Sequence, residues 1–402
     1  MHILRVGIWL DSNYKPTEGG GYSYYEKLVR NIDNYDFSRN IEIIFLTEST
    51  TKPSIKKDVR AISLINRCLK YDSIVLKCFP SLYKHFRKVR RIIERPYYYF
   101  LFRKLHIDVI YYLKQEECHI SNYPFIATNW DIGLVSTYPF PEIVTDFNRR
   151  KNFYENILPK AIFVFCESES GKEELRKYTS IDEFKLRTVP LFSGNCTSLV
   201  IDDIHSITFL DKYKLVRNEY FFYSAQFWAH KNHYGLLLAF ARIVRDFLNI
   251  KLVFTGSDKG NLQYIKDVVT DLKLENHVLI LGFVSAEEIN ILYKNAISFV
   301  MPTYLGATNM PPIEAMELNC PVICSELTGH KEILGDSALY FNPQNITSIE
   351  MKMREILDES VRNELKKKLS LKQKESIFKV EYAIKKIEEH LLELLYIRKT
   401  WR

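Results

Sequence analysis

One stretch of the sequence combines a strand end, a loop and a helix start within a short span. Residues 301–326 read MPTYLGATNMPPIEAMELNCPVICSE, in which an apolar strand end precedes a loop with Gly306, Thr308 and Asn309 and then a double proline. Proline fits the first turn of a helix, because its φ is already helical and its missing N–H is not needed there. The stretch therefore predicts a helix that follows a buried strand after a short loop.

A carboxylate comes directly after the two prolines. We expect Glu314 inside the first helical turn, beside backbone N–H groups that have no partner within the helix. Loop amides and the helix dipole suit phosphate oxygens, while a carboxylate accepts hydrogen bonds from vicinal hydroxyls such as those of a ribose. The pattern predicts a site for a phosphorylated, hydroxyl-rich ligand.

The length and the order of apolar segments indicate two domains. The chain has 402 residues, more than one ordinary core holds, and strand-like runs alternate with helical stretches in both halves. The runs are apolar almost throughout, which is typical of buried parallel strands. We therefore expect an α/β protein with two doubly wound domains, at residues 1–205 and 206–378. The amphipathic stretch at 379–402 is interpreted as a helix that packs back on the first domain or as an ordinary terminal helix.

The strands expected in the first half follow one another at regular intervals. They are Arg5 to Leu10, Ile41 to Leu46, Asp108 to Tyr112, Pro124 to Asn129, Ile162 to Cys166 and Lys185 to Leu191.

Cysteine usage and hydropathy bound the setting of the protein. Seven cysteines are scattered without zinc-finger spacing, and no apolar run is long enough to span a bilayer. We expect a cytoplasmic protein with free thiols, and peripheral attachment to the inner face of the cell membrane is an alternative setting. No Asp-x-Asp pair stands at an expected strand end, so neither a metal nor a cofactor is expected.

The positive charge is concentrated in one segment. Residues from Lys84 to Lys104 include eight basic side chains and one glutamate, a local excess equal to the formal net charge of +7 of the whole chain. Aromatic residues are interspersed, which favours contact with an anionic membrane surface. The alternative is a solvated helix face followed by core-facing aromatic residues. Nucleic acid is not expected as a partner, because no recognition signature accompanies the charge.

Three further positions favour an anionic ligand. Gly20 and Gly21 belong to a glycine-rich turn between a strand and a helix, which lets backbone approach a phosphate or is simply a flexible turn. Asp131 ends a strand and either points into a ligand crevice or caps the next helix. Lys231 stands where a helix is expected to start, a position unfavourable for a cation unless an anion is bound nearby.

Taken together, these segments resemble glycosyltransferase family 4, the retaining sugar transferases of the GT-B type. The likeness covers nearly the whole chain and is strongest from Tyr220 to Pro343, where TGSDKGNLQYIKDVV, LGFVSAEEINILYKNAISFVMPTY and CPVICSELTGHKEILGDSALYFNP follow the donor-binding domain of the family. The segments GGGYSYYEKL and KAIFVFCESESGKEEL resemble the first domain. The resemblance implies two facing Rossmann-like domains, with the nucleotide-sugar on the C-terminal one and the acceptor against the N-terminal one.

The resemblance also implies roles for individual residues. It places Glu314 on the ribose hydroxyls and Lys231 on the donor diphosphate, with Asp131 orienting the acceptor hydroxyl or the donor sugar. These three are the expected catalytic residues. The remaining donor-binding positions, which complete the set with Lys231 and Glu314, are Gly20, Gly21, Gln226, Gly282, Phe283, Val284, Gly306, Thr308 and Asn309.

Three positions depart from the family pattern. Gly306 stands where the first glutamate of a pair is expected, Gln226 where an arginine is common, and Trp130 where a histidine often precedes the aspartate. Branches of the family that read Gly-x-Thr-Asn-x-Pro-Pro-x-Glu and Gln-Phe-Trp-x-His-Lys-Asn share the first two changes, so we interpret the departures as a subfamily pattern. They leave open what replaces the sugar contacts of the first glutamate.

The function expected from these observations is transfer of a sugar, with retention, from a nucleotide-sugar to a saccharide or lipid-linked saccharide in bacterial surface polysaccharide (O-antigen or capsule) synthesis. A non-catalytic nucleotide-sugar-binding or partner subunit of GT-B fold is the alternative. A nucleotide-sugar epimerase or phosphorylase of the same fold is a third reading, although no lysine-bound pyridoxal phosphate signature occurs. The sequence leaves the base, the sugar, the acceptor and the linkage open.

Overall fold

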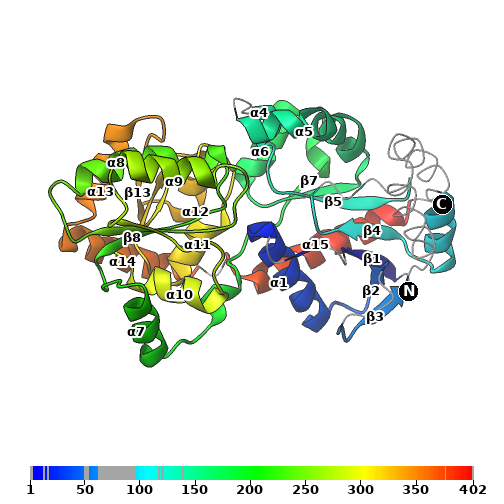
Figure 1. Cartoon of the computed structure of the whole chain (residues 1–402). Helices are drawn as coiled ribbons and strands as arrows, with labels where there is room; N and C mark the ends of the chain where they lie inside the picture. Colours follow the sequence, from blue (N-terminus) through cyan, green and yellow to red (C-terminus); the bar gives the residue numbers. More distant parts are fainter. Residues whose placement is uncertain are drawn as a thin grey trace, which may run out of the picture.

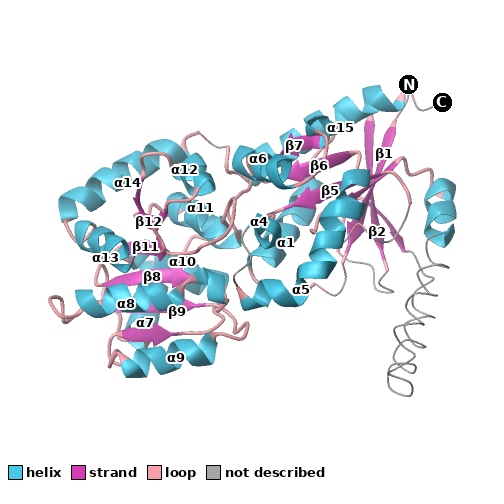
Figure 2. Ribbon diagram, turned by 90° about the horizontal axis from the view of Figure 1, so that it is seen from above, coloured by secondary structure: helices cyan, strands magenta, loops and turns pink. Residues whose placement is uncertain are grey.

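The protein consists of two α/β lobes. The computed structural model describes residues 3–11, 14–15, 18–48, 54–61, 96–115, 118, 122–136, 140–375 and 377–400. Within these residues, a parallel sheet forms the centre of each lobe, and helices cover both faces of each sheet (Figure 1 and Figure 2). The expected pair of doubly wound domains is therefore confirmed.

The first sheet has seven strands among the described residues, in the order β3-β2-β1-β4-β5-β6-β7, and all neighbours pair in parallel. The strands are β1 (Leu4–Leu10), β2 (Ile41–Thr47), β3 (Asp58–Ala61), β4 (Val109–Tyr112), β5 (Phe125–Asn129), β6 (Phe163–Cys166) and β7 (Leu186–Thr188). The sequence predicted six of these to within a few residues. It missed β3, because this edge strand is mostly exposed and lacks an apolar run.

The second sheet has six strands in the described part of the chain, in the order β10-β9-β8-β11-β12-β13, again all parallel. The strands are β8 (Tyr220–Ser224), β9 (Lys251–Thr255), β10 (Val278–Ile280), β11 (Ser298–Met301), β12 (Val322–Ser325) and β13 (Ala338–Phe341). Its central strands are fully buried, as their uninterrupted apolar character predicts.

Helices connect the strands. In the first lobe these are α1 (Gly20–Asn34), α4 (Gly133–Ser136), α5 (Pro141–Asn152) and α6 (Glu169–Tyr178). Around the second sheet they are α7 (Asp203–Lys212), α8 (His233–Ile243), α9 (Leu262–Asp271), α10 (Ala286–Asn295), α11 (Met310–Glu317), α12 (Thr328–Leu334), α13 (Ile346–Glu355) and α14 (Glu359–Gln373). One terminal helix follows, α15 (Val380–Arg398).

The strand order of each sheet reverses at one place, between β1 and β4 in the first sheet and between β8 and β11 in the second. The connections that leave the carboxyl ends of two such strands run to opposite faces of the sheet, so a crevice opens between them. The two crevices fix where a ligand can lie.

The terminal helix α15 returns to the first lobe, where it lies against α1 (Figure 1). Its Glu388 carboxylate accepts hydrogen bonds from the Tyr35 hydroxyl at 2.7 Å and from the backbone N–H of Ser38 at 2.6 Å. Its Glu393 forms an ion pair with Arg187, and its Arg398 one with Asp108. The last helix therefore ties the end of the chain to the first sheet.

Two expectations concern the surroundings of the protein. None of the helices among the described residues is both long enough and apolar enough to cross a membrane.

Within the basic segment from Lys84 to Lys104, residues 84–95 lie outside the described part of the chain. Residues 96–104 form a helix in which Tyr98 and Phe102 are buried and Phe100 is 68% exposed. Part of its aromatic run thus belongs to the core. The five described cysteines are free and buried.

The contacts of α15 predict a specific stability loss. Replacing Glu388 with alanine removes two hydrogen bonds to a carboxylate, and such bonds contribute about 1.5–3 kcal/mol each. We expect the Glu388→Ala variant to unfold at a lower temperature than the wild type. Glu389→Ala is the matched control, because Glu389 forms an ion pair with Lys386 at the surface, where such a pair contributes about 0–1 kcal/mol. Equal losses in the two variants would show that Glu388 does not anchor α15.

Candidate functional site

A cavity of about 510 Å³ lies between the two lobes, at the carboxyl ends of both sheets. It brings together most of the predicted site residues from segments far apart in the sequence. The predicted residues that line it are Gly20, Gly21, Asp131, Gln226, Lys231, Phe283, Val284, Thr308, Asn309 and Glu314. Gly282 and Gly306 are not part of the lining.

The glycine-rich turn opens the N-terminus of α1 toward this cavity. Gly19 is the N-cap residue of α1 and has a φ of 76°. It has no side chain that could accept a hydrogen bond from the first turn, and the first turn contains no acidic residue. A Cβ on Gly21 would lie 2.3 Å from the Tyr14 hydroxyl oxygen, whereas one on Gly20 would meet nothing within 4 Å. The absence of side chains thus keeps the N–H groups of the first turn accessible, which suits a phosphate.

Lys231 follows β8, one of the two strands at the reversal of the second sheet. It lies in a short 3-10 turn, Ala229–Lys231, and α8 begins only at His233, so the helix starts two residues after the lysine and not at the lysine itself, where the sequence had indicated its start. Its amine donates to Asn309 Oδ1 at 3.2 Å. Burial lowers the pKa of Lys231 to about 8, although the Asp131 carboxylate acts in the opposite direction.

Glu314 follows β11, the second strand at the reversal. The helix α11 begins at Met310, one residue before the prolines, so Glu314 lies in the second turn and the expectation of a first-turn position was wrong. Its carboxylate accepts a hydrogen bond from the Tyr293 hydroxyl at 3.2 Å, and burial raises its pKa. A Cβ on Gly194 would lie 2.2 Å from Glu314 Oε1, so the segment that connects the lobes passes directly beside this carboxylate.

Gly306 has a structural reason for not being a glutamate. Its φ is 116°, a conformation that side chains rarely adopt, and a Cβ there would lie 2.5 Å from Asn309 Nδ2. The amide of Asn309 therefore occupies the space into which a side chain at 306 would project. The replacement of the expected glutamate by Gly306 therefore goes together with the backbone conformation of the loop and with the presence of Asn309.

Gln226 and the 282–284 turn form the opposite side of the site. Gln226 Oε1 accepts from Trp228 Nε1 at 3.1 Å, and a Cβ on Gly19 would lie 2.8 Å from Gln226 Nε2. The residue that replaces the expected arginine thus reaches the glycine turn of the other lobe. Gly282, with φ 71°, turns the chain so that Phe283 and Val284 line the cavity, and Phe283 is 59% exposed.

Asp131 combines the two roles between which the sequence left a choice. Its Oδ1 accepts from the backbone N–H of Gly133 at 3.1 Å, at the start of α4, and its side chain also lines the cavity. Trp130, in place of the expected histidine, lines the cavity as well and meets the Tyr24 ring edge-on at 5.7 Å. Its indole nitrogen is buried and has no hydrogen-bond partner among the described residues.

Glu167 lines the cavity but was not among the predicted residues. It follows β6 directly, and its carboxyl group accepts a hydrogen bond from the Thr308 hydroxyl of the other lobe. Burial raises the pKa of Glu167 well above its usual range. The signal that pointed to Asp131, a carboxylate directly after a strand, was present here too. The next residue, Ser168, caps α6.

Further contacts hold the two lobes together around the cavity. Glu142 of α5 accepts from the backbone N–H of His230 at 3.0 Å, and His230 Nδ1 lies 2.6 Å from the same oxygen. Burial lowers the pKa of the His230 imidazole. Burial alone would raise the pKa of the Glu142 carboxyl, but the hydrogen bonds from His230 outweigh this effect and the pKa is lowered.

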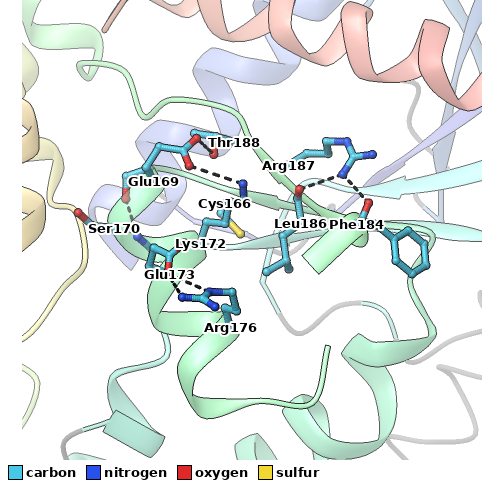
Figure 3. Close-up of polar contacts among 12 residues, drawn as sticks. Cys166, Glu169, Ser170, Lys172, Glu173, Arg176, Phe184, Leu186, Arg187 and Thr188 are labelled. Atoms are coloured by element: carbon cyan, nitrogen blue, oxygen red, sulfur yellow. Dashed lines mark hydrogen bonds and ion pairs between the residues drawn. The ribbon is translucent and has the colours of Figure 1, made fainter. Parts of the chain in front are cut away.

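The first turn of α6 makes the next contact between the lobes. Its N–H groups at Glu169 and Ser170 donate to the Glu332 carboxylate of α12, at 2.9 and 2.8 Å. Figure 3 shows that the Glu169 side chain points to Thr188 and Lys172 of its own lobe. The negative charge at the start of α6 thus comes from both lobes and complements the helix dipole.

Comparison with known proteins agrees with this geometry. Residues 209–375 match the family model described as Glycosyl transferases group 1. The O-antigen chain mannosyltransferase RfbU of Salmonella typhimurium is 28% identical over 193 residues, which are 48% of this chain and 50% of that protein. The chain thus spans about half the length of the curated relatives it matches first.

Solved structures resemble the whole chain. A glycosyltransferase from Rickettsia africae has a TM-score of 0.66 at 14% identity, over 98% of this chain and 99% of that one. Anabaena HepE, solved in complex with UDP and glucose, has a TM-score of 0.67 at 13% identity, over 97% of this chain and all of that one. At such identities the likeness establishes the fold, the GT-B arrangement of two facing Rossmann-like domains.

The coupling between Gly306 and Asn309 predicts that even a methyl group at position 306 disturbs the site. We expect Gly306→Ala to lower the melting temperature and to weaken any nucleotide-induced stabilisation, because the added Cβ displaces the Asn309 amide. Gly260→Ala is the matched control, since Gly260 has a similar φ of 101° but nothing within 4 Å of the added Cβ. The difference between the two variants isolates the contact with Asn309 from backbone strain. Indistinguishable variants would contradict the coupling.

Proposed function

Residues 209–375 of this chain belong to the group 1 glycosyltransferases, and we propose that the whole chain is a retaining glycosyltransferase that uses a nucleotide-sugar donor. One observation carries the proposal. Lys231 and Glu314 emerge from β8 and β11, the two strands at the reversal of the second sheet, and both face the cavity into which the N-terminus of α1 opens from the other lobe. A cation, a carboxylate and a helix N-terminus match a diphosphate joined to a ribose.

The donor lies with its ribose on Glu314 and its diphosphate between Lys231 and the amides at Thr308 and Asn309. The base packs against the turn with Phe283, whose ring is exposed and free to stack. The sugar then points toward the first lobe, where Asp131, Trp130 and Glu167 line the cavity. These polar groups are the ones available to sugar and acceptor hydroxyls.

Transfer with retention breaks the bond between the anomeric carbon and the phosphate oxygen and forms the new bond on the same face of the sugar. The acceptor hydroxyl gives its proton to the departing phosphate oxygen. The protein stabilises the charge that develops on this phosphate, which is the task of Lys231 and the loop amides, and each such donor in a water-excluded site contributes about 2.7–4 kcal/mol. Asp131 orients the acceptor hydroxyl or the donor sugar.

The relatives suggest the substrates. RfbU is an O-antigen chain mannosyltransferase, so a hexose such as mannose is the first sugar to test, and the acceptor is a saccharide or lipid-linked saccharide of a bacterial surface polysaccharide. HepE was solved with UDP and glucose, so the base has to be determined directly. The reaction takes place on the cytoplasmic side, where nucleotide-sugars are available.

The experiment that tests the function is a thermal-shift and calorimetric screen of UDP, GDP, ADP and dTDP and their sugars. We expect one nucleotide to stabilise the wild type and to lose this effect in Glu314→Ala, which removes the ribose contact. Glu317→Ala, on the same helix but outside the cavity lining, is expected to bind as the wild type does. If no nucleotide binds the wild type, the proposal fails and a non-catalytic partner subunit becomes the better reading.

Turnover is then measured with the donor that the screen identifies. Lys231→Ala is expected to fold normally and to lower turnover at least tenfold, because the charge on the departing phosphate loses its cation. Lys331→Ala is the control, since Lys331 is half exposed and pairs with Glu326. Wild-type turnover in Lys231→Ala would exclude the lysine from the mechanism.

A lipid-linked acceptor would require the enzyme to reach a membrane. The basic segment from Lys84 to Lys104 supplies charge for anionic lipid head groups, and at its described end Phe100 is exposed. We expect co-sedimentation with vesicles that contain anionic phospholipid, decreasing as salt is added. Reversing the charges of Arg87, Arg90 and Arg91 should abolish it. Attachment that survives the reversal would assign membrane binding to another surface.

A further inference from the structure

A buried histidine behind the cavity is connected to Lys231 by a chain of hydrogen bonds. His330 lies in α12, is fully buried and does not line the cavity. Its Nδ1 lies 2.9 Å from the carbonyl oxygen of Ser325, and because a carbonyl only accepts, Nδ1 carries the proton. Its Nε2 lies 3.0 Å from Asn309 Nδ2. The amide nitrogen is the donor there, so Nε2 accepts and the imidazole is the neutral Nδ1–H tautomer.

This tautomer determines which way the Asn309 amide points. With Nδ2 donating to His330, the amide oxygen faces Lys231 and accepts from its amine at 3.2 Å. The reversed amide would set an NH2 group against the ammonium of Lys231 and place its oxygen against a ring nitrogen that has no proton. Both contacts of the reversed amide are repulsive, so His330 selects the orientation that Lys231 needs.

The electrostatics of the site support the same assignment. Burial lowers the pKa of His330 to about 4, with the positive charge of Lys231 acting in the same direction, so the imidazole stays neutral near pH 7. Asp131 after β5 favours the charged form of Lys231, and the charge of Lys231 in turn lowers the pKa of His230 beside it, of His233 in α8 and of His330 in α12. His233 is buried and its pKa is lowered to about 3, so it too is neutral. The Asn309 oxygen is therefore one of few acceptors for the buried ammonium.

Packing fixes the position of His330 relative to Asn309. A Cβ on Gly329 would lie 1.2 Å from the carbonyl oxygen of Ala307, so the start of α12 contacts the backbone of the cavity loop, the loop between β11 and α11, directly. The loop carries Asn309, and the same contact sets the distance between Asn309 and His330. Gly306 has no side chain and therefore leaves room for the side-chain amide of Asn309.

We propose that His330 is a positioning residue, which acts through the Asn309 amide to hold the Lys231 amine in place and in its charged form at the cavity. The proposal rests on the proposed function for its purpose, the binding of a diphosphate. Its physical content, the influence of His330 on Lys231, is testable without any substrate.

The measurement is the pKa of Lys231 in the ligand-free full-length protein, followed by NMR with lysine labelled with ¹³C at Cε. The Lys231→Met variant identifies the resonance by its loss. In His330→Leu the amide loses its acceptor and is free to reverse, so we expect the Lys231 pKa to fall by about one unit. In Asn309→Asp a carboxylate faces the amine, and we expect a rise of about one unit or more.

A conservative variant separates positioning from simple packing. In His330→Gln the side-chain amide can donate to Ser325 and accept from Asn309, as the imidazole does, so the wild-type pKa of Lys231 should be retained. With an active donor identified, the fall of turnover at alkaline pH should move with the Lys231 pKa in each variant, because the amine is charged only below its pKa.

The outcomes are distinct. A folded His330→Leu variant whose Lys231 pKa equals that of the wild type would overturn the proposal, whatever Asn309→Asp shows. If His330→Leu does not fold, His330→Met takes its place with the same two outcomes, a fall of the Lys231 pKa in support and the wild-type value against. Failure of the proposed function would appear elsewhere, as a wild type that binds no nucleotide.

Discussion

The parallel pairing of β8 with β11 is the constraint on which the arrangement of the cavity depends. Because the strand order of the second sheet reverses there, the chain leaves these two strands toward opposite faces, and Lys231 and Glu314 stand on either side of one crevice. The first sheet reverses in the same way between β1 and β4, and the helix that follows β1 presents its N-terminus to the crevice. Residues of both lobes line the cavity, so the site forms where the two lobes face each other.

Three polar contacts between the lobes lie at this boundary. Glu142 binds His230 beside Lys231, Thr308 of the loop after β11 binds Glu167, and Glu332 caps α6 from the other lobe. Two of the three contacts involve residues adjacent to, or within, the cavity lining. A ligand that bridges the lobes would therefore lie beside the same contacts that hold the lobes together. The helix α15, which follows α14 and packs on α1, adds a further connection between the lobes.

The fold and several residues of the cavity lining could be predicted because their signals are local. Uninterrupted apolar runs marked six strands of the first sheet, a strand end supplied Asp131, and expected helix starts supplied Lys231 and Glu314. β3 was missed because it is an exposed edge strand with no apolar signal, and the start of α11 was misplaced by one residue, which put Glu314 in the wrong turn. Glu167 was overlooked although its signal, a carboxylate directly after a strand, was local. His330 had no local signal, since its role depends on a contact between α12 and the cavity loop.

The glycine at 306 shows why a departure from a family pattern need not mean a lost site. Taken alone, a glycine in place of a glutamate removes a carboxylate that could bind sugar hydroxyls. In the structure the same glycine, at φ 116°, makes room for the amide of Asn309, which contacts Lys231 on one side and His330 on the other. The loop thus places a neutral hydrogen-bond acceptor beside the Lys231 amine. A neutral acceptor does not compete with a phosphate for the positive charge of Lys231 as a carboxylate would, and it keeps the buried amine hydrogen-bonded while no phosphate is bound.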